Sequence, residues 1–168
     1  MFIATKDTKV IAIHEVEWQC RRNAKGLSKP EYWTWLETVT TEDENGHKTY
    51  DFSGEDYEIV ETDAPLSYQD EEGNTIDFNQ SGHIHEGHYH LTWDGSAITP
   101  DDTALTECQT AEKWKNIRAD RNRKLAETDY LALSDQTLSA EMSTYRQALR
   151  DIPSQSDPDN ITWPTKPE

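Results

Sequence analysis

The sequence has few apolar residues and no long apolar run. Hydrophobic residues make up 33% of its 168 residues, whereas globular chains hold about 45–50% when glycine is counted. No run approaches the roughly 20 apolar residues that a membrane-spanning helix needs, so we expect no membrane span. Residues 1–16 contain no long apolar segment and no small-residue cleavage site, so we expect no signal peptide. Six Trp, seven Tyr and three Phe favour small cores built from aromatic side chains.

Cysteine is scarce, and no glycine-rich phosphate loop occurs. The two cysteines, Cys20 and Cys108, lie far apart and form no CxxC pair, so the sequence supports neither a zinc knuckle nor a redox motif. Free thiols in a reducing cytosol are expected, and a disulfide within the chain or to a partner is left open. We therefore expect the protein to be made and used in a cytosol.

Basic residues are few and unevenly placed. The formal net charge is −17, from 16 Lys and Arg against 33 Asp and Glu. Up to Leu105 there are seven basic residues against 22 acidic ones, whereas Thr106 to Asp151 hold eight of each. Binding to nucleic acid through phosphates needs a basic surface, so we expect no nucleic-acid partner. The acidic front fits a solvated surface or one that docks a basic partner.

Residues 1–98 carry the pattern of short strands joined by turns. Strand-like runs occupy residues 9–16, 32–41 and 56–62, and turn signals include Asn45-Gly46 and Asp94-Gly95. The run YWTWLETVTT at 32–41 alternates aromatic and polar residues at its start, which favours a strand with one buried face. Turn signals this frequent predict an acidic, antiparallel β-rich domain over residues 1–98.

The pattern becomes helical after residue 98. Thr99 as cap, Pro100 at the first helical position and two acids after it predict a helix start. A second helix has apolar residues at spacings of 4, 3, 4 and 3, namely Leu138, Met142, Tyr145, Leu149 and Ile152. Pro153 should end that helix. We predict an α+β fold with a helical hairpin over 99–152 and an extended, Pro-rich tail over 153–168.

The C-terminal third also resembles a known family. The segment IRADRNRKLAETDY, the later run YRQALRDIP and the Trp163-Pro164 pair resemble the C-terminal domain of phage tail assembly chaperone proteins. That domain also occurs at the ends of some phage tail-fibre proteins. The resemblance covers residues 112–167, and Tyr130 stands where the family commonly has Trp.

The resemblance implies a non-enzymatic protein that binds a phage tail-fibre or baseplate protein. It would act in the host cell cytoplasm during assembly, as a chaperone or adaptor, or remain in the virion tail as a permanent subunit. Tyr, Trp and Arg dominate interface anchors, so the candidate partner-binding residues are Arg118, Arg121, Tyr130, Tyr145, Arg146, Arg150 and Trp163. The arginines could equally hold the hairpin in shape, with Arg118 or Arg121 pairing to Asp129 or Asp151. Trp163 could pack on the hairpin or on a partner.

Four of the six histidines lie in the stretch GHIHEGHYH, at His83, His85, His88 and His90. A two-residue turn at Glu86-Gly87 would place them on one face of a hairpin. Opposed Cβ atoms would lie about 5 Å apart, close enough for four ring nitrogens to bind one transition metal such as Zn, Fe or Ni. A surface hairpin whose histidines only stack or form hydrogen bonds is the alternative.

Two other arrangements of the same histidines are open. Three copies around a trimer axis would offer six nitrogens for an octahedral metal such as iron, an arrangement that resembles His-x-His sites of phage spikes and fibres. A metal-dependent hydrolase is the third reading, because the spacing from His83 to His88 resembles that of metallo-β-lactamase-like enzymes. Gly87 stands at the Asp position of that motif, and the chain is too short for that fold.

Overall fold

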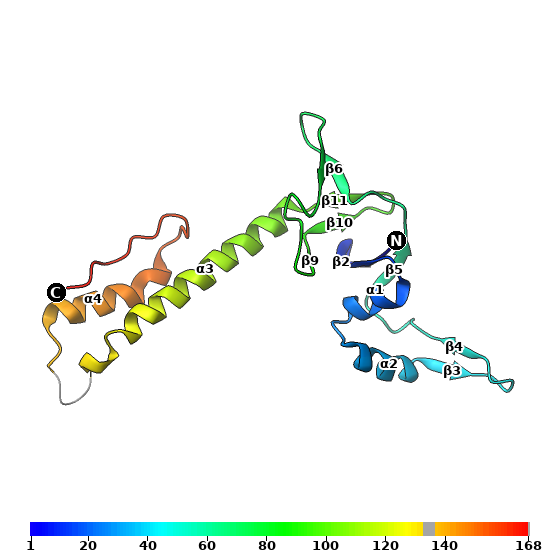
Figure 1. Cartoon of the computed structure of the whole chain (residues 1–168), viewed down its shortest axis with the longest axis horizontal. Helices are drawn as coiled ribbons and strands as arrows, with labels where there is room; N and C mark the ends of the chain where they lie inside the picture. Colours follow the sequence, from blue (N-terminus) through cyan, green and yellow to red (C-terminus); the bar gives the residue numbers. More distant parts are fainter. Residues whose placement is uncertain (133–136, 168) are drawn as a thin grey trace. The chain divides into compact units, whose positions relative to one another are not determined.

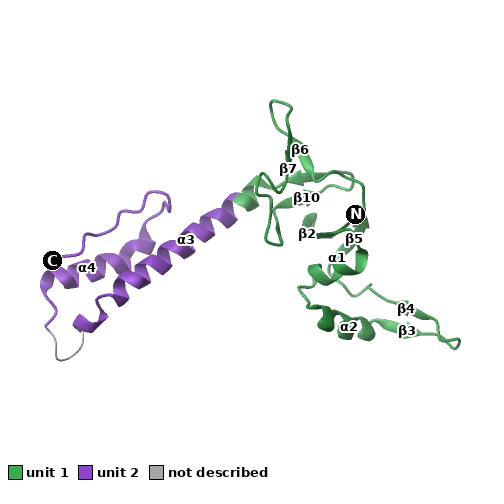
Figure 2. Cartoon of the chain, viewed as in Figure 1, with its two compact units in different colours: residues 1–105 green, residues 106–168 purple. Residues whose placement is uncertain are grey.

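The structure is a computed structural model that describes residues 1–132 and 137–167. The chain forms two compact units, unit 1 with Met1–Leu105 and unit 2 with Thr106–Glu168 (Figure 2). Unit 1 holds antiparallel sheets and two short helices, and unit 2 is helical. The predicted α+β class is confirmed. Among the described residues, no helix is both long enough and apolar enough to cross a membrane.

Unit 1 is built on an antiparallel sheet of five strands in the order β11-β10-β2-β1-β5 (Figure 1). The strands are β1 Phe2–Lys6, β2 Lys9–His14, β5 Glu58–Glu61, β10 Leu91–Trp93 and β11 Ile98–Pro100. Side chains alternate between the faces of a strand. Ile3 and Ala4, neighbours in β1, therefore belong to different buried clusters. Val10 and Ala12 of β2 also fall in different clusters, although they are two residues apart, because the β1–β2 register shifts by one residue between them. The sheet thus has a core on each face.

Three small hairpins extend the sheet unit. They pair β3 Thr40–Glu42 with β4 Lys48–Tyr50, β6 Ser67–Gln69 with β7 Thr75–Asp77, and β8 Ile84–His85 with β9 His88–Tyr89. The turn predicted at Asn45-Gly46 is present between β3 and β4. It is part of a loop longer than two residues, which the Asp43 amide closes by donating to the His47 carbonyl at 3.0 Å. The antiparallel arrangement predicted from the turn signals is confirmed.

The strand predicted at residues 32–41 is wrong over most of its length. Residues Lys29–Thr38 form helix α2, and only β3 is extended; helix α1, Glu17–Ala24, was not predicted either. Ser28 and Glu31 form a reciprocal capping box at the start of α2, a motif that fixes a helix start. Tyr32 and Trp35 are three residues apart, and their ring centroids lie 5.4 Å from each other. The capping box at Ser28 and the helical spacing of the aromatic residues together favour a helix more strongly than the short alternation of aromatic and polar residues favours a strand.

Unit 2 contains most of the long helix α3, Asp102–Ala126, and the helix α4, Ala140–Asp151, with short 3-10 turns η1 Asp129–Ala132 and η2 Ile152–Ser154. The predicted hairpin is confirmed, and α4 ends directly before the turn that holds Pro153. The predicted start of the first helix is two residues early. Pro100 belongs to β11, and Asp101 is the cap, accepting from the Ala104 amide at 3.0 Å.

Apolar residues of α4 form the core of unit 2. Met142, Tyr145 and Leu149 are buried, and four partly buried residues pack on them, namely Leu125, Leu131, Leu138 and Trp163. The stripe predicted for this helix is therefore the core face. The C-terminal segment contributes to that core through Trp163, which packs on the hairpin.

Candidate functional site

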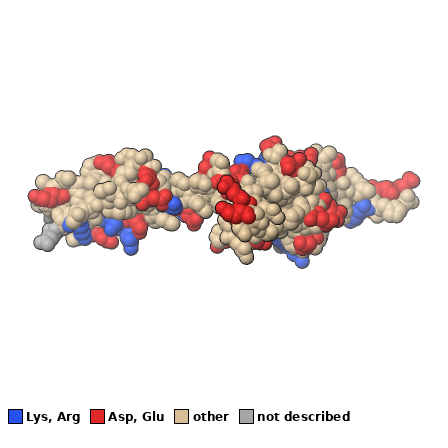
Figure 3. Space-filling view, turned by 90° about the horizontal axis from the view of Figure 1, so that it is seen from above, with Lys and Arg blue, Asp and Glu red and all other residues tan. Residues whose placement is uncertain are grey.

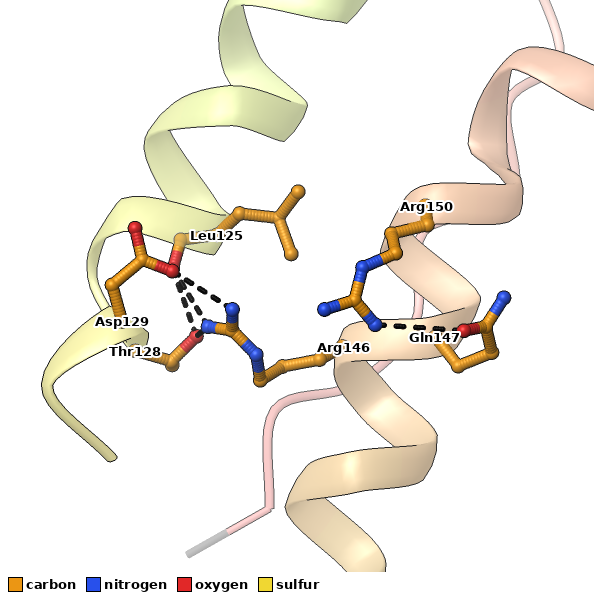
Figure 4. A network of polar contacts seen from close by, with 6 residues as sticks. All are labelled: Leu125, Thr128, Asp129, Arg146, Gln147 and Arg150. Carbon is orange, nitrogen blue, oxygen red and sulfur yellow. Dashed lines mark hydrogen bonds and ion pairs between the residues drawn. The ribbon is translucent and has the colours of Figure 1, made fainter. Parts of the chain in front are cut away.

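Arg146 of α4 joins the two helices of unit 2 (Figure 4). Its Nη1 donates to the Leu125 carbonyl at 3.0 Å and to Thr128 Oγ1 at 2.6 Å, and its Nη2 donates to Asp129 Oδ1 at 2.8 Å. The last carbonyls of a helix have no partner inside the helix. The Leu125 carbonyl accepts from the amide and the hydroxyl of Thr128, both at 3.0 Å, and Arg146 adds a charged donor to it. Arg146 is only 7% exposed and Thr128 only 1%. The Arg146 guanidinium therefore holds α4 against the C-terminal end of α3.

The ion pairs expected from the sequence differ from those in the structure. Arg121 bonds the Asn122 side chain, its sequence neighbour. Asp151 accepts from Gln147 Nε2 at 3.0 Å. The partner of Asp129 is Arg146, 17 residues away, rather than Arg118 or Arg121. Tyr145 is a core residue of the hairpin and only 5% exposed, so it is not accessible to a partner protein.

The other candidate partner-binding residues lie nearer the surface. Tyr130 is 61% exposed. The Arg118 guanidinium carbon lies 6.0 Å from the centroid of the Trp114 ring. Arg150 is exposed, with Gln147 Oε1 at 3.5 Å. Trp163 is half-buried, with Lys124 Nζ 5.5 Å from its ring. Tyr130, Arg118 and Arg150 are therefore available to a second protein.

A shallow groove runs between α4 and the C-terminal segment. Its volume is 490 Å³, and its lining is mostly apolar, with Ala140, Thr144 and Ala148 on one side and Pro164 and Pro167 on the other. Residues four apart lie on one face of a helix, so the small residues leave room along α4. The groove has the size and chemistry to take an apolar side chain. The spacing of small residues is a signal that sequence reasoning missed.

The far wall of the groove is fixed by several bonds of the C-terminal segment. Lys113 of α3 pairs with Asp159 at 2.7 Å. The Gln155 side chain donates to the Thr162 carbonyl and accepts from the Thr162 amide, at 3.1 and 2.9 Å. These bonds, together with the packing of Trp163 on the core, hold the segment in place.

The histidine stretch forms a tight hairpin at the predicted place. Glu86 and Gly87 occupy its turn with φ of 48° and 81°. A type I′ turn, which joins the strands of tight hairpins, requires a positive φ at both of its central residues. His85 is paired with His88 across the strands, and the His90 amide donates to the His83 carbonyl at 2.8 Å. The backbone register therefore follows the sequence prediction.

The four imidazoles differ in their surroundings. His83 is 2% exposed, with Nδ1 2.8 Å from Ser81 Oγ and Nε2 3.1 Å from Asp102 Oδ1. The His85 side chain is 73% exposed. Burial, together with the nearby His83 and His88, lowers the pKa of His90. Over residues 1–132 and 137–167, no three His, Cys, Asp or Glu side chains are placed to hold a metal ion. A metal at this hairpin stays a prediction.

Comparison with known families adds an observation on unit 2. Residues 114–168 match the family model described as phage tail assembly chaperone protein. The resemblance predicted for this segment is thereby confirmed. The match falls on unit 2 and includes every candidate partner-binding residue, while residues 1–113 lie outside it. No curated protein and no solved structure matched the chain. The family match supports a non-enzymatic role in phage tail assembly.

Proposed function

We propose that the chain is a tail assembly chaperone or adaptor that binds a tail-fibre or baseplate protein through unit 2. The observation that carries the proposal is the match of residues 114–168 to the chaperone family. The site of action would be the host cytoplasm while tails are assembled. The proposal places the contact on the groove beside α4, with the exposed Arg118, Tyr130 and Arg150 as further contacts.

The make-up of unit 2 supports this assignment. Among the described residues of unit 2, the core cluster has three buried members, Met142, Tyr145 and Leu149. A second surface packed on this unit would add burial that a two-helix unit lacks by itself. Interfaces combine an apolar centre with a polar rim in which Tyr and Arg are frequent. The groove supplies an apolar surface, and the exposed arginines and Tyr130 supply polar and aromatic groups.

The experiment compares two full-length variants with the same charge change on the same helix. Thr144→Arg places a long side chain in the groove, whereas Ser143→Arg, on the exposed surface of α4, does not line it. Affinity for purified tail-fibre and baseplate proteins of the phage is measured by titration calorimetry, and circular dichroism confirms that both variants fold. We expect Thr144→Arg to weaken binding about tenfold or more and Ser143→Arg to change it little.

Two results would overturn the proposal. One is that neither a tail-fibre nor a baseplate protein binds the unmodified chain. The other is that Thr144→Arg and Ser143→Arg bind the same partner equally well, which would place the contact away from the groove.

The alternative role is that of a permanent tail subunit, which would carry the same family domain as an attachment. Quantitative mass spectrometry of purified mature virions separates the two roles. A transient chaperone is absent from them, whereas a permanent subunit is present at a fixed ratio to the other tail proteins.

A further inference from the structure

Six aromatic side chains of unit 1 form a continuous cluster outside the segment that matches the family. Neighbouring ring centroids lie 5.3 to 6.0 Å apart along the series Trp18, Trp33, Tyr32, Trp35, Phe52 and Tyr50. Tyr32 is 2% exposed, whereas Trp33 is 44% and Tyr50 49% exposed. The cluster is therefore both a small core and an aromatic surface.

Basic side chains already lie over part of this cluster. The Arg21 guanidinium carbon is 3.8 Å from the centroid of Phe52, and Lys25 Nζ is 4.4 Å from that of Trp35. Such contacts are favourable because the face of an aromatic ring is electronegative. In the part of the chain that the structure describes, no Lys or Arg lies over the ring of Trp33 or Tyr50. One part of each ring packs on the cluster, Trp33 on Trp18 and Tyr50 on Phe52, and the remaining exposed surface is accessible to a cation from another molecule.

Trp33 and Tyr50 lie at a groove of 380 Å³ between α2 and the β3–β4 hairpin. The groove is also lined by Leu36, Glu37, Thr40, Glu42 and Lys48. Leu36 gives the groove an apolar patch, and the two glutamates give it negative charge. Lys48, which is paired with Glu42 in the hairpin, is the one basic residue of its lining.

The surroundings of the groove are electrostatically negative. Helix α2 ends beside it at Thr38, and its last turn holds no basic residue. The C-terminal end of a helix carries a partial negative charge, which attracts cations. Residues 29–50 contain five acidic residues against two lysines. Acidic side chains are also frequent on the face of unit 1 that Figure 3 shows.

We propose that this groove binds an arginine side chain carried by an extended segment of a partner protein. The planar guanidinium would stack on Trp33 and Tyr50, while Glu37 and Glu42 accept its hydrogen bonds. Arginine fits better than lysine, because a guanidinium both stacks on aromatic faces and pairs with carboxylates through two donors. The groove lies in unit 1, so this contact is independent of the function proposed for unit 2.

The test uses the full chain and the synthetic peptide Gly-Arg-Gly-Arg-Gly, followed by NMR of the tryptophan indole NH groups. The Trp33 signal is assigned with a Trp33→Phe variant. We expect the peptide to shift that signal in a saturable way at millimolar concentration. The same peptide with citrulline in place of arginine keeps the shape and loses the charge, and we expect it to leave the signal in place.

Charge variants of the chain show whether the groove itself is responsible. We expect Glu37→Gln and Glu42→Gln each to weaken binding about threefold to tenfold. Glu44→Gln removes the same charge from the exposed hairpin loop outside the groove and should change binding little. The proposal is overturned if arginine and citrulline peptides act alike, if the Trp33 signal does not move, or if Glu44→Gln weakens binding as much as the groove variants.

Discussion

At the scale of single residues, Arg146 illustrates what the sequence can and cannot supply. The motif YRQALRDIP draws attention to Arg146, and the motif alone is compatible with both a structural and a binding role. Its partners, Leu125 and Thr128, depend on how α4 packs on the end of α3. The spacing of residues along the sequence does not reveal that packing. The structure favours the structural role. Tyr130 shows the opposite outcome, since it remains 61% exposed.

Replacing Arg146 with Met should destabilise unit 2 by about 2–3 kcal/mol, because the Leu125 carbonyl and the buried Thr128 hydroxyl lose a charged donor. Urea unfolding followed by circular dichroism at a helix wavelength measures the change. Arg150→Met is the matched control. Arg150 is exposed with one long bond to Gln147, so it should change stability by at most about 0.5 kcal/mol. Equal effects of the two variants would show that the Arg146 network is not what holds the hairpin.

At the scale of elements, the turns were easier to predict than the helices of unit 1. A glycine at positive φ marks a turn through one or two residues, and the tight turn at Glu86-Gly87 is an example. Helix α2 depends on two signals of different range, the capping box at Ser28 and the ring contacts of Tyr32 with α1. The capping box can be read from the sequence, whereas the contact with α1 is tertiary. The alternation of aromatic and polar residues reflects neither, and it therefore gave the wrong element.

The aspartate turns of unit 1 should make its stability fall in acid. Hydrogen bonds from the backbone amides of Ala97 and Ser96 lower the pKa of Asp94, and the His47 amide lowers that of Asp43. A folded-state pKa below the unfolded value means that stability is full above about pH 4 and is lost as the pH falls through the folded-state pKa. Urea midpoints measured from about pH 6 down to about pH 2 should therefore decrease.

Asn at position 94 keeps an acceptor but no longer titrates. Asp94→Asn should accordingly make the acid decrease shallower, whereas Asp63→Asn, at an exposed aspartate, should leave its slope nearly unchanged. A slope unaffected by Asp94→Asn would rule out this turn as a source of the acid sensitivity.

The histidine hairpin gives a prediction about metal. His85 and His88 are opposed across the turn, so they can supply two ligands of a site. Further copies of the chain could complete it, whereas a four-histidine site would require His83 to give up its contacts with Ser81 and Asp102. Elemental analysis of protein prepared with and without air should find Zn, Fe or Ni, and a His85→Ala, His88→Ala double variant should lose it. Light scattering then separates a four-histidine site in a monomer from a six-histidine site in a trimer. Protein free of metal under both conditions would refute the site.

At the scale of the whole molecule, the two units differ in net charge and in their similarity to known protein families. Acidic residues dominate unit 1, and the family match lies in unit 2. The short pattern around YRQALRDIP was enough to show the resemblance of residues 114–168 to the family, because several of its residues, such as Arg146 and Leu149, hold one hairpin together. The aromatic groove of unit 1 has no such motif. It joins residues of α2 and of a hairpin that only the fold brings together.

Hydrogen–deuterium exchange of the whole chain, with and without a purified tail-fibre or baseplate protein, shows directly whether unit 2 binds a phage tail protein. We expect slower exchange in α4 and in residues 155–167, which border the groove, when the partner is bound. Slower exchange confined to residues 1–105 would contradict the claim for unit 2, even though it would leave the proposal for the aromatic groove standing.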